Sequence, residues 1–215
     1  INTIRFLLDL FPSGTSQKDD DGNLPIHLHI ALRYRGANTF SDNDFDILRL
    51  LIVHSITYGE IDSIGGLFHQ DPEEDRSCTL AMLLEEAGEE NTEKVWQAIS
   101  QCLEEVGEYS DAPIVHAAIL NRNHVPRKLF REILVRFGAN SRNEHGELPL
   151  TYSARNGMEW DKGFADILEA NRDAMNEVDI ETNLPFAIFA ASTKADLSSI
   201  YHLALKNLHL FTSQQ

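Results

Sequence analysis

Histidine side chains are the residues of this chain with the most obvious chemical potential, because imidazole is a common metal ligand. The chain has nine histidines, and His27 and His29 stand two positions apart. On a helix, residues two apart point to different faces. No HExxH motif and no cysteine pair supplies further zinc ligands. We therefore expect no metal site at the histidines.

The acidic segment 18–23, Lys-Asp-Asp-Asp-Gly-Asn, resembles the start of a calcium loop. An EF-hand loop places acids at positions 1, 3 and 5, glycine at position 6 and glutamate at position 12. With Gly22 at the sixth position, the first ligand is Gln17 and the twelfth residue is Leu28. Neither residue fits, so the pattern excludes a calcium site of this type.

Motifs for nucleophilic or phosphate chemistry are missing from the sequence. It contains no G-x-S-x-G, no Walker A loop and no G-x-G-x-x-G. Pairs of glutamates flank Gly88, and paired acids can serve as general acid and base. They lie in what we interpret as a polar turn, so we expect a solvated surface there. The sequence predicts no catalytic residues, no cofactor and no metal.

The charge balance narrows the classes of partner. Of 215 residues, 34 are Asp or Glu and 18 are Lys or Arg, which gives a net charge of −16. Nucleic acids and anionic membranes need a positive binding face, so we expect neither as a partner. The longest apolar runs are too short to span a bilayer. Acidic charge also keeps proteins in solution, and a basic protein partner is the functional alternative.

The two cysteines, Cys78 and Cys102, lie in separate expected helices and form no CxxC pair. Two are too few for a disulfide scaffold, so we expect an intracellular, cytoplasmic protein with reduced thiols. The chain begins at Ile1 rather than Met and without a signal peptide. We expect it to be a fragment, and its oligomeric state stays open.

Short similar segments recur along the chain. Three of them end in Leu-Pro followed by an apolar residue, at 21–26, 145–150 and 181–186, and weaker copies lie at 111–115 and 78–80. We call the Pro of each segment, or the Thr at position 79, its mark. Successive marks at positions 79, 113, 149 and 185 are 34, 36 and 36 residues apart, whereas 25 to 79 spans 54. A period in the mid-thirties is typical of stacked helical hairpins.

Each mark precedes two segments with helical features. The expected first helices are 26–32, 80–84, 114–120, 150–154 and 186–191, and the second are 45–54, 93–106, 127–137, 164–172 and 197–208. Residues 2–11 fit the second helix of an incomplete unit. Proline suits a helix start, and the second segments carry apolar residues at helical spacing.

We therefore predict an all-α protein, an α-solenoid of about five degenerate helix-turn-helix repeats in a single domain, 1–215. The units are 1–17 (partial), 18–72, 73–106, 107–142, 143–178 and 179–215. Five leucine and isoleucine residues should be buried between neighbouring units: Ile133, Leu134, Leu148, Leu150 and Leu168. Segments 33–44 and 58–76 are expected to be solvated loops; a contact loop is the alternative for 58–76.

The pattern resembles the ankyrin repeat, whose motif is roughly D-x-x-G-x-T-P-L-H-x-A-A, then a second helix, then G-A-D-x-N. The first repeat matches at Asp19, Gly22, Pro25, Ile26 and His27, and the fourth at Asn143, Gly146, Pro149, Leu150 and Ala154. In the third, His116 is shifted by one position, and 137–140 resembles the G-A-D-x-N close. The Gly-x-Leu-Pro variant is similar to divergent ankyrin-like arrays of diatom and related algal proteins.

This resemblance implies a non-catalytic protein–protein interaction scaffold, in which His27 forms structural hydrogen bonds between turns. Partner contacts would come from the turn tips and from the exposed face of the first helices. The tips are Asp20, Asp21, Asn23, Glu144, His145, Glu147, Ile180, Glu181 and Asn183, and the face includes Arg155, Asn156 and Ser192. Acidic tips side by side favour a basic partner. The alternative is a regulatory repeat array attached to, or itself part of, an enzyme outside this fragment.

Overall fold

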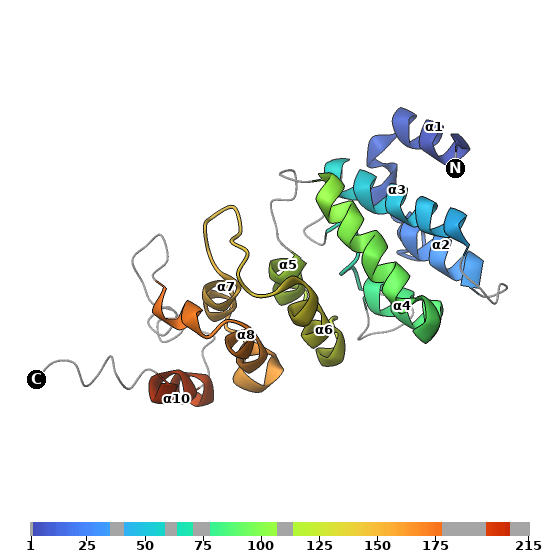
Figure 1. Cartoon of the computed structure of the whole chain (residues 1–215). Helices are drawn as coiled ribbons and strands as arrows, with labels where there is room; N and C mark the ends of the chain where they lie inside the picture. The colour runs from blue at the N-terminus through green and yellow to red at the C-terminus, as the bar shows by residue number, and fades with distance from the viewer. Residues whose placement is uncertain are drawn as a thin grey trace, which may run out of the picture. The chain divides into compact units, whose positions relative to one another are not determined.

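The computed structural model of the chain is built from helices (Figure 1). It describes residues 2–34, 41–58, 64–70, 78–106, 114–177 and 197–206. Within these ranges there is no strand, only an isolated antiparallel bridge between Gln70 and Cys78. The predicted all-α class is confirmed for this part of the chain. No helix in it is both long and apolar enough to cross a lipid bilayer.

The chain divides into two compact units. The N-terminal unit comprises Ile1–Asp111 and Asn121–Pro126. The C-terminal unit comprises Ala112–Leu120 and Arg127–Gln215. Each unit has its own set of packed helices.

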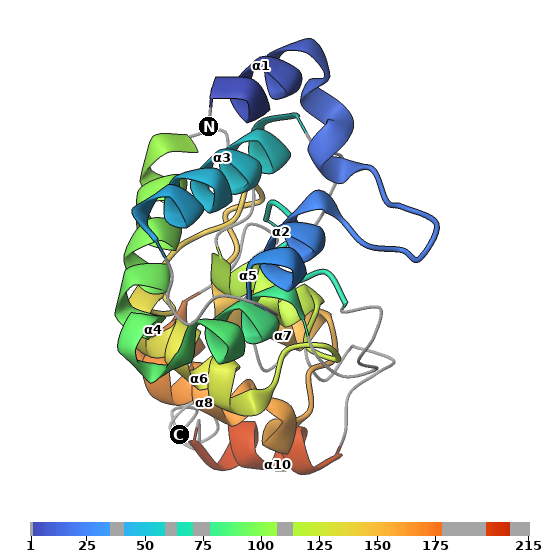
Figure 2. The same cartoon turned by 90° about the vertical axis from the view of Figure 1, so that its right-hand side faces the viewer.

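Four α-helices form the described part of the N-terminal unit: α1 (Asn2–Leu10), α2 (Pro25–Tyr34), α3 (Asp42–Tyr58) and α4 (Thr79–Val106), with a short 3₁₀ helix, η1 (Pro12–Ser16), after α1. Helix α4 is broken at Gly88, whose φ of 70° and ψ of 169° are not helical. The break separates the two helices that the sequence predicts for the second repeat. Helices α3 and α4 lie side by side, and α2 packs against both (Figure 2).

The segment at 64–70 corrects the expectation of a solvated loop, because Leu67 and Phe68 have no exposed surface. Two glycines with positive φ bring the chain into the core. A Cβ on Gly65 would lie 2.8 Å from the Ile52 carbonyl oxygen, and one on Gly66 would lie 2.9 Å from Leu24 Cδ1. Only glycine fits such close approaches. The rest of segment 58–76, residues 59–63 and 71–77, lies outside the described residues, so the alternative of a contact loop is not tested there.

Five α-helices form the described part of the C-terminal unit: α5 (Ile114–Leu120), α6 (Arg127–Phe137), α7 (Pro149–Arg155), α8 (Phe164–Ala170) and α10 (Leu197–Lys206). Two 3₁₀ helices, η3 (Trp160–Lys162) and η4 (Asp173–Asn176), flank α8. Helices α5 and α7, the expected first helices of the third and fourth units, pack against each other, and so do the expected second helices, α6 and α8. Side-by-side packing of equivalent helices is what stacked hairpins require.

Burial in the C-terminal unit follows the predicted pattern. Ile133, Leu134, Leu148, Leu150 and Leu168 are each at most 5% exposed, as expected. An ion-pair cluster adds to this packing, because Asp166 on α8 accepts hydrogen bonds from Arg127 and Arg131 on α6. The Asp166 side chain is only 8% exposed. Despite the opposing effect of burial, the two guanidinium groups lower the pKa of Asp166.

The helix positions agree closely with the sequence expectation. Helices α5 and α6 have the predicted bounds, α7 is one residue longer at each end, and α8 ends two residues earlier than predicted. Helix α10 begins at the predicted residue, and its predicted last two residues lie outside the described residues. Helix α3 extends further than predicted at both ends. The expected first helix of the last repeat, 186–191, lies outside the described residues.

Candidate functional site

The first predicted tip is a tight loop that we call the Asp19 turn, residues 19–23. Asp19 Oδ1 accepts hydrogen bonds from the backbone N–H groups of Asn23 (2.8 Å) and Asp21 (3.0 Å). The Gly22 N–H donates to the Asp19 carbonyl, with Gly22 at φ 87°. These hydrogen bonds, that from the Asn23 N–H above all, lower the pKa of Asp19. Asp20 and Asp21, at the apex of the loop, are exposed.

The second predicted tip, the Asn143 turn of residues 143–147, repeats this hydrogen-bond pattern in the C-terminal unit. Asn143 Oδ1 accepts from the N–H groups of Glu147 (2.9 Å) and His145 (3.1 Å). The Gly146 N–H donates to the Asn143 carbonyl at 2.8 Å, with Gly146 at φ 74°. In both turns the backbone of the first and fifth residues is also joined by an N–H···O bond. Two segments 124 positions apart in the sequence thus fold into the same loop.

A buried histidine joins helix α2 to the start of helix α4. His27 is 3% exposed, and its Nδ1 accepts a hydrogen bond from the Leu24 N–H at 3.1 Å. Because Nδ1 is an acceptor, the proton lies on Nε2, which donates to Thr79 Oγ1 at 2.5 Å. Thr79 lies where the sequence pattern predicts the second unit to begin. The structural role implied for His27, hydrogen bonding between turns, is confirmed.

His116 makes the equivalent connection in the C-terminal unit, although it is shifted by one position in the sequence. It is 2% exposed, and Nε2 lies 2.9 Å from the Glu147 carbonyl oxygen, to which it donates. Nδ1 is buried without a hydrogen-bond partner among the described residues. Burial lowers the pKa of His116, which favours the neutral ring. In both compact units, a histidine on an expected first helix therefore bonds the segment that begins the next expected first helix.

Glu147 does not behave as a tip residue, which corrects its place among the predicted partner contacts. It is 5% exposed. Its Oε1 accepts a hydrogen bond from Arg155 Nε at 2.6 Å, and its Oε2 accepts from Asn143 Nδ2 at 3.1 Å. The cause is the position of Arg155 at the end of α7, beside the turn. The side chain of Arg155 is therefore engaged in the fold too, although it is 42% exposed.

The remaining predicted contacts divide into exposed residues and residues that the structure does not describe. Glu144 and His145 are exposed, with Glu144 Oε1 3.5 Å from His145 Nε2. Asn23 is half-buried and bonded to Asp19. Asn156 is also half-buried, and its amide donates to the Tyr152 carbonyl. The other predicted contacts, Ile180, Glu181, Asn183 and Ser192, lie outside the described residues.

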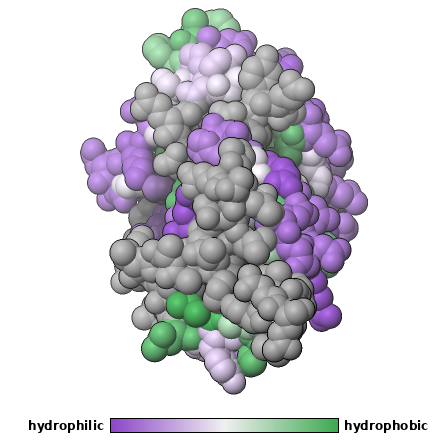
Figure 3. All heavy atoms as spheres, turned by 90° about the vertical axis from the view of Figure 1, so that its left-hand side faces the viewer, coloured by the Kyte–Doolittle hydropathy of each residue, from purple (hydrophilic) through white to green (hydrophobic). Residues whose placement is uncertain are grey.

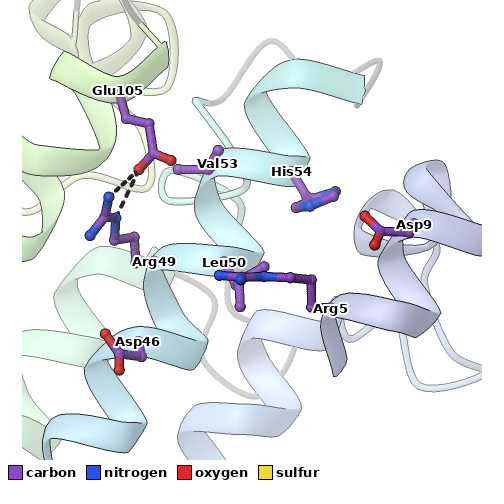
Figure 4. A pocket seen from close by; sticks show the side chains of 8 residues that line it. All are labelled: Arg5, Asp9, Asp46, Arg49, Leu50, Val53, His54 and Glu105. Atoms are coloured by element: carbon purple, nitrogen blue, oxygen red, sulfur yellow. Dashed lines mark hydrogen bonds and ion pairs between the residues drawn. The ribbon is translucent and has the colours of Figure 1, made fainter. Parts of the chain in front are cut away.

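A groove in the N-terminal unit was not expected from the sequence (Figure 4). It encloses about 400 Å³ and is lined by Arg5, Asp9, Asp46, Arg49, Leu50, Val53, His54 and Glu105. Arg49 on α3 donates from Nε and Nη2 to Glu105 Oε2 on α4, at 2.8 and 2.6 Å. Helix periodicity could not reveal this groove, because its walls come from three separate helices.

The thiols and histidines do not form a chemical centre in the described part of the chain. Cys78 and Cys102 are free and buried. Burial raises the pKa of both thiols, that of Cys102 to about 12, so neither is a thiolate at neutral pH. Among the described residues, no group of three His, Cys, Asp or Glu side chains is arranged to hold a metal ion.

The comparisons with known proteins add no relative. No protein-family model, no curated protein and no solved structure matches this chain.

Proposed function

We propose that this chain is a non-catalytic protein-interaction scaffold, a solenoid of degenerate ankyrin-like repeats that presents its turn tips to a basic protein partner. The observation that carries the proposal is the duplicated turn. The Asp19 and Asn143 turns have the same hydrogen bonds, and each directs its second and third residues to solvent. A loop held rigid by internal bonds while its apex stays exposed is suited to recognition, since little ordering entropy is lost on binding.

The charges on the two tips support a basic partner in different degrees. The Asp19 turn exposes Asp20 and Asp21 beside the exposed carboxylate of Asp19. The Asn143 turn exposes Glu144 next to His145, while Glu147 is paired with Arg155. The stronger negative field is therefore at the Asp19 turn, and we propose that this turn leads recognition of Lys- or Arg-rich surfaces.

Peptide display tests this function directly, because a random library includes basic, acidic and neutral ligands alike. The library is selected on the wild-type chain and on the Asp20→Lys/Asp21→Lys variant. The matched control is Glu85→Lys/Glu86→Lys, which changes two exposed acids of α4 and alters the net charge equally. We expect basic peptides that bind the wild type and the control but not the tip variant. Peptides that bind all three chains equally would exclude the Asp19 turn as the recognition surface.

A further inference from the structure

The groove of the N-terminal unit carries more charge than its own contacts neutralise. It encloses about 400 Å³, within the usual range for small-molecule sites. On the α4 side, Arg49 and Glu105 neutralise each other through two hydrogen bonds. On the α1 side lie Arg5 and Asp9, and neither has a hydrogen bond or ion pair with any residue that the structure describes. Two opposite charges are therefore left for a ligand.

Helix α1 separates its charged side chains from its apolar ones. Phe6, Leu7 and Leu10 are each more than half exposed. In the space-filling view, green side chains gather at the top, where α1 lies (Figure 3). Arg5 and Asp9, one helical turn apart, line the groove instead. On its α1 side, the groove therefore offers charge rather than an apolar surface.

Helix α3 supplies apolar contacts and one further polar atom. Leu50 and Val53 line the groove and are half-buried. Nδ1 of His54 is buried and has no hydrogen-bond partner among the described residues. In the close-up, the Asp9 carboxylate points towards the His54 ring (Figure 4). Arg5 extends towards Leu50 and away from Asp9, so the cation and the anion lie at separate places in the groove.

The balance of these charges selects the kind of ligand. A simple anion at Arg5 would also meet the carboxylates of Asp9 and Asp46, and a simple cation at Asp9 would meet the Arg5 guanidinium. A molecule with both charges on one small unit pairs with both side chains. The α-carboxylate and α-ammonium of a free amino acid form such a unit. An apolar side chain on it would match Leu50 and Val53.

We propose that this groove binds a free, zwitterionic α-amino acid with an apolar side chain. Arg5 pairs with its carboxylate, Asp9 pairs with its ammonium, and Leu50 and Val53 contact its side chain. Nδ1 of a neutral His54 accepts a further hydrogen bond from the ammonium. Because Arg5 and Asp9 are exposed, each ion pair contributes little, and the dissociation constant should be in the millimolar range. The site is separate from the turn tips and goes beyond the function proposed above.

Titration of the whole chain with L-leucine, followed in amide NMR spectra, tests the proposal. Leucine should cause saturable shifts of amide resonances in α1 and α3. Two analogues each remove one charge, since isocaproate lacks the ammonium and isoamylamine lacks the carboxylate. Each analogue should bind several-fold more weakly than leucine, because one ion pair is lost.

Two neutral substitutions assign each charge of the ligand to its partner. Arg5→Gln should weaken binding of leucine and isocaproate several-fold without weakening that of isoamylamine. Asp9→Asn should weaken binding of leucine and isoamylamine without weakening that of isocaproate. Both side chains are exposed, so the circular dichroism spectrum should stay unchanged. As controls, Glu132→Gln and Arg136→Gln alter an ion pair of the same spacing on α6 and should leave binding unchanged.

Three results would overturn the proposal. The first is a leucine titration without saturable shifts in α1 and α3. The second is equal binding of leucine and both analogues, which would show that the groove takes apolar molecules regardless of charge. The third is wild-type affinity for leucine in Arg5→Gln or Asp9→Asn.

Discussion

The Asp19 turn and the Asn143 turn have the same hydrogen bonds but place their charges differently. In the Asp19 turn the anchoring residue is itself an exposed acid, and the fifth residue, Asn23, is half-buried. In the Asn143 turn the anchor is a neutral amide, and the fifth residue, Glu147, is a buried acid held by Arg155. The backbone thus depends on a side-chain oxygen at the first position and a glycine at the fourth, while the other positions are free to change.

The histidines that follow the turns differ in a similar way. His27 uses both ring nitrogens, whereas His116 uses Nε2 and leaves Nδ1 buried without a partner among the described residues. Both rings nevertheless bond the segment that begins the next expected unit, since His27 reaches Thr79 and His116 reaches the Glu147 carbonyl. Equivalent hydrogen bonds are thus made from positions that the sequence pattern does not align.

The largest losses of stability should come from truncating the leucine that directly follows each turn. The two losses should be equal if the turns are equivalent. Leu24 is fully buried and Leu148 is 3% exposed. Leu24→Ala and Leu148→Ala should each lower the free energy of unfolding by about 2–5 kcal/mol, through lost burial and a cavity. Urea denaturation followed by ¹⁹F NMR measures this, because 5-fluorotryptophan at Trp96 and Trp160 reports each unit separately. If Leu148→Ala leaves the free energy of unfolding unchanged, the two turns are not equivalent. Leu28→Ala, at a 39% exposed leucine, is the control.

The buried acid should make the Asn143 turn more sensitive to loss of a partner than the Asp19 turn. Arg155→Met leaves the Glu147 carboxylate buried without its cation, and should cost about 2 kcal/mol. Asn23→Ala removes a half-exposed amide and should cost less than about 1 kcal/mol. If the added variant Glu147→Gln recovers most of the loss in Arg155→Met, the unpaired charge is the cause. If Arg155→Met and Asn23→Ala lower the free energy of unfolding equally, the Asn143 turn is not the more sensitive of the two.

Much of this fold could be predicted from the sequence because its signals are local. Helical spacing of apolar residues located α6, and the Leu-Pro mark located the start of α7. The burial of Leu67 and Phe68 could not be predicted, because Gly65 and Gly66 also fit an exposed turn. The pairing of Glu147 with Arg155 could not be predicted either, because it depends on where helix α7 ends in space.

The two turns could be predicted from the sequence as tips, but the groove could not. A tip needs only its own five residues, whose types and order are visible in the chain. The groove combines Arg5 of α1, Arg49 of α3 and Glu105 of α4. Such a site depends on how three helices pack, for which no single segment carries a pattern.

Acid should weaken the C-terminal unit through His116. Burial lowers the folded-state pKa of His116, so its neutral ring contributes stability above the ordinary histidine pKa of about 6.5. As the pH falls below that value, the unfolded chain binds the proton first and the contribution is lost. In urea denaturation followed at Trp160, the urea concentration at the midpoint should fall as the pH is lowered. His116→Gln keeps a donor for the Glu147 carbonyl and should flatten the dependence; an unchanged slope would contradict this cause.

A smaller effect at lower pH should distinguish the two anchors. The pKa of Asp19 is lowered in the folded chain, so its stabilising bonds are present above the ordinary range for Asp, about 3.9. They are lost as the pH falls through the lowered value. The amide resonances of Asp21 and Asn23 should shift together there, while that of His145, bonded to Asn143, should not follow. Asp19→Asn should remove the shift, and a persisting shift would assign it to another group.

The central claim, that the Asp19 turn steers a basic partner, is tested most directly by stopped-flow association with a basic peptide obtained by selection. Asp20→Lys/Asp21→Lys should slow association several-fold at low salt and flatten its salt dependence. Glu85→Lys/Glu86→Lys, with the same change in net charge, should leave both nearly unchanged. If the two variants slow association equally, only net charge matters, and if the tip variant associates at the wild-type rate, the Asp19 turn is not the recognition surface.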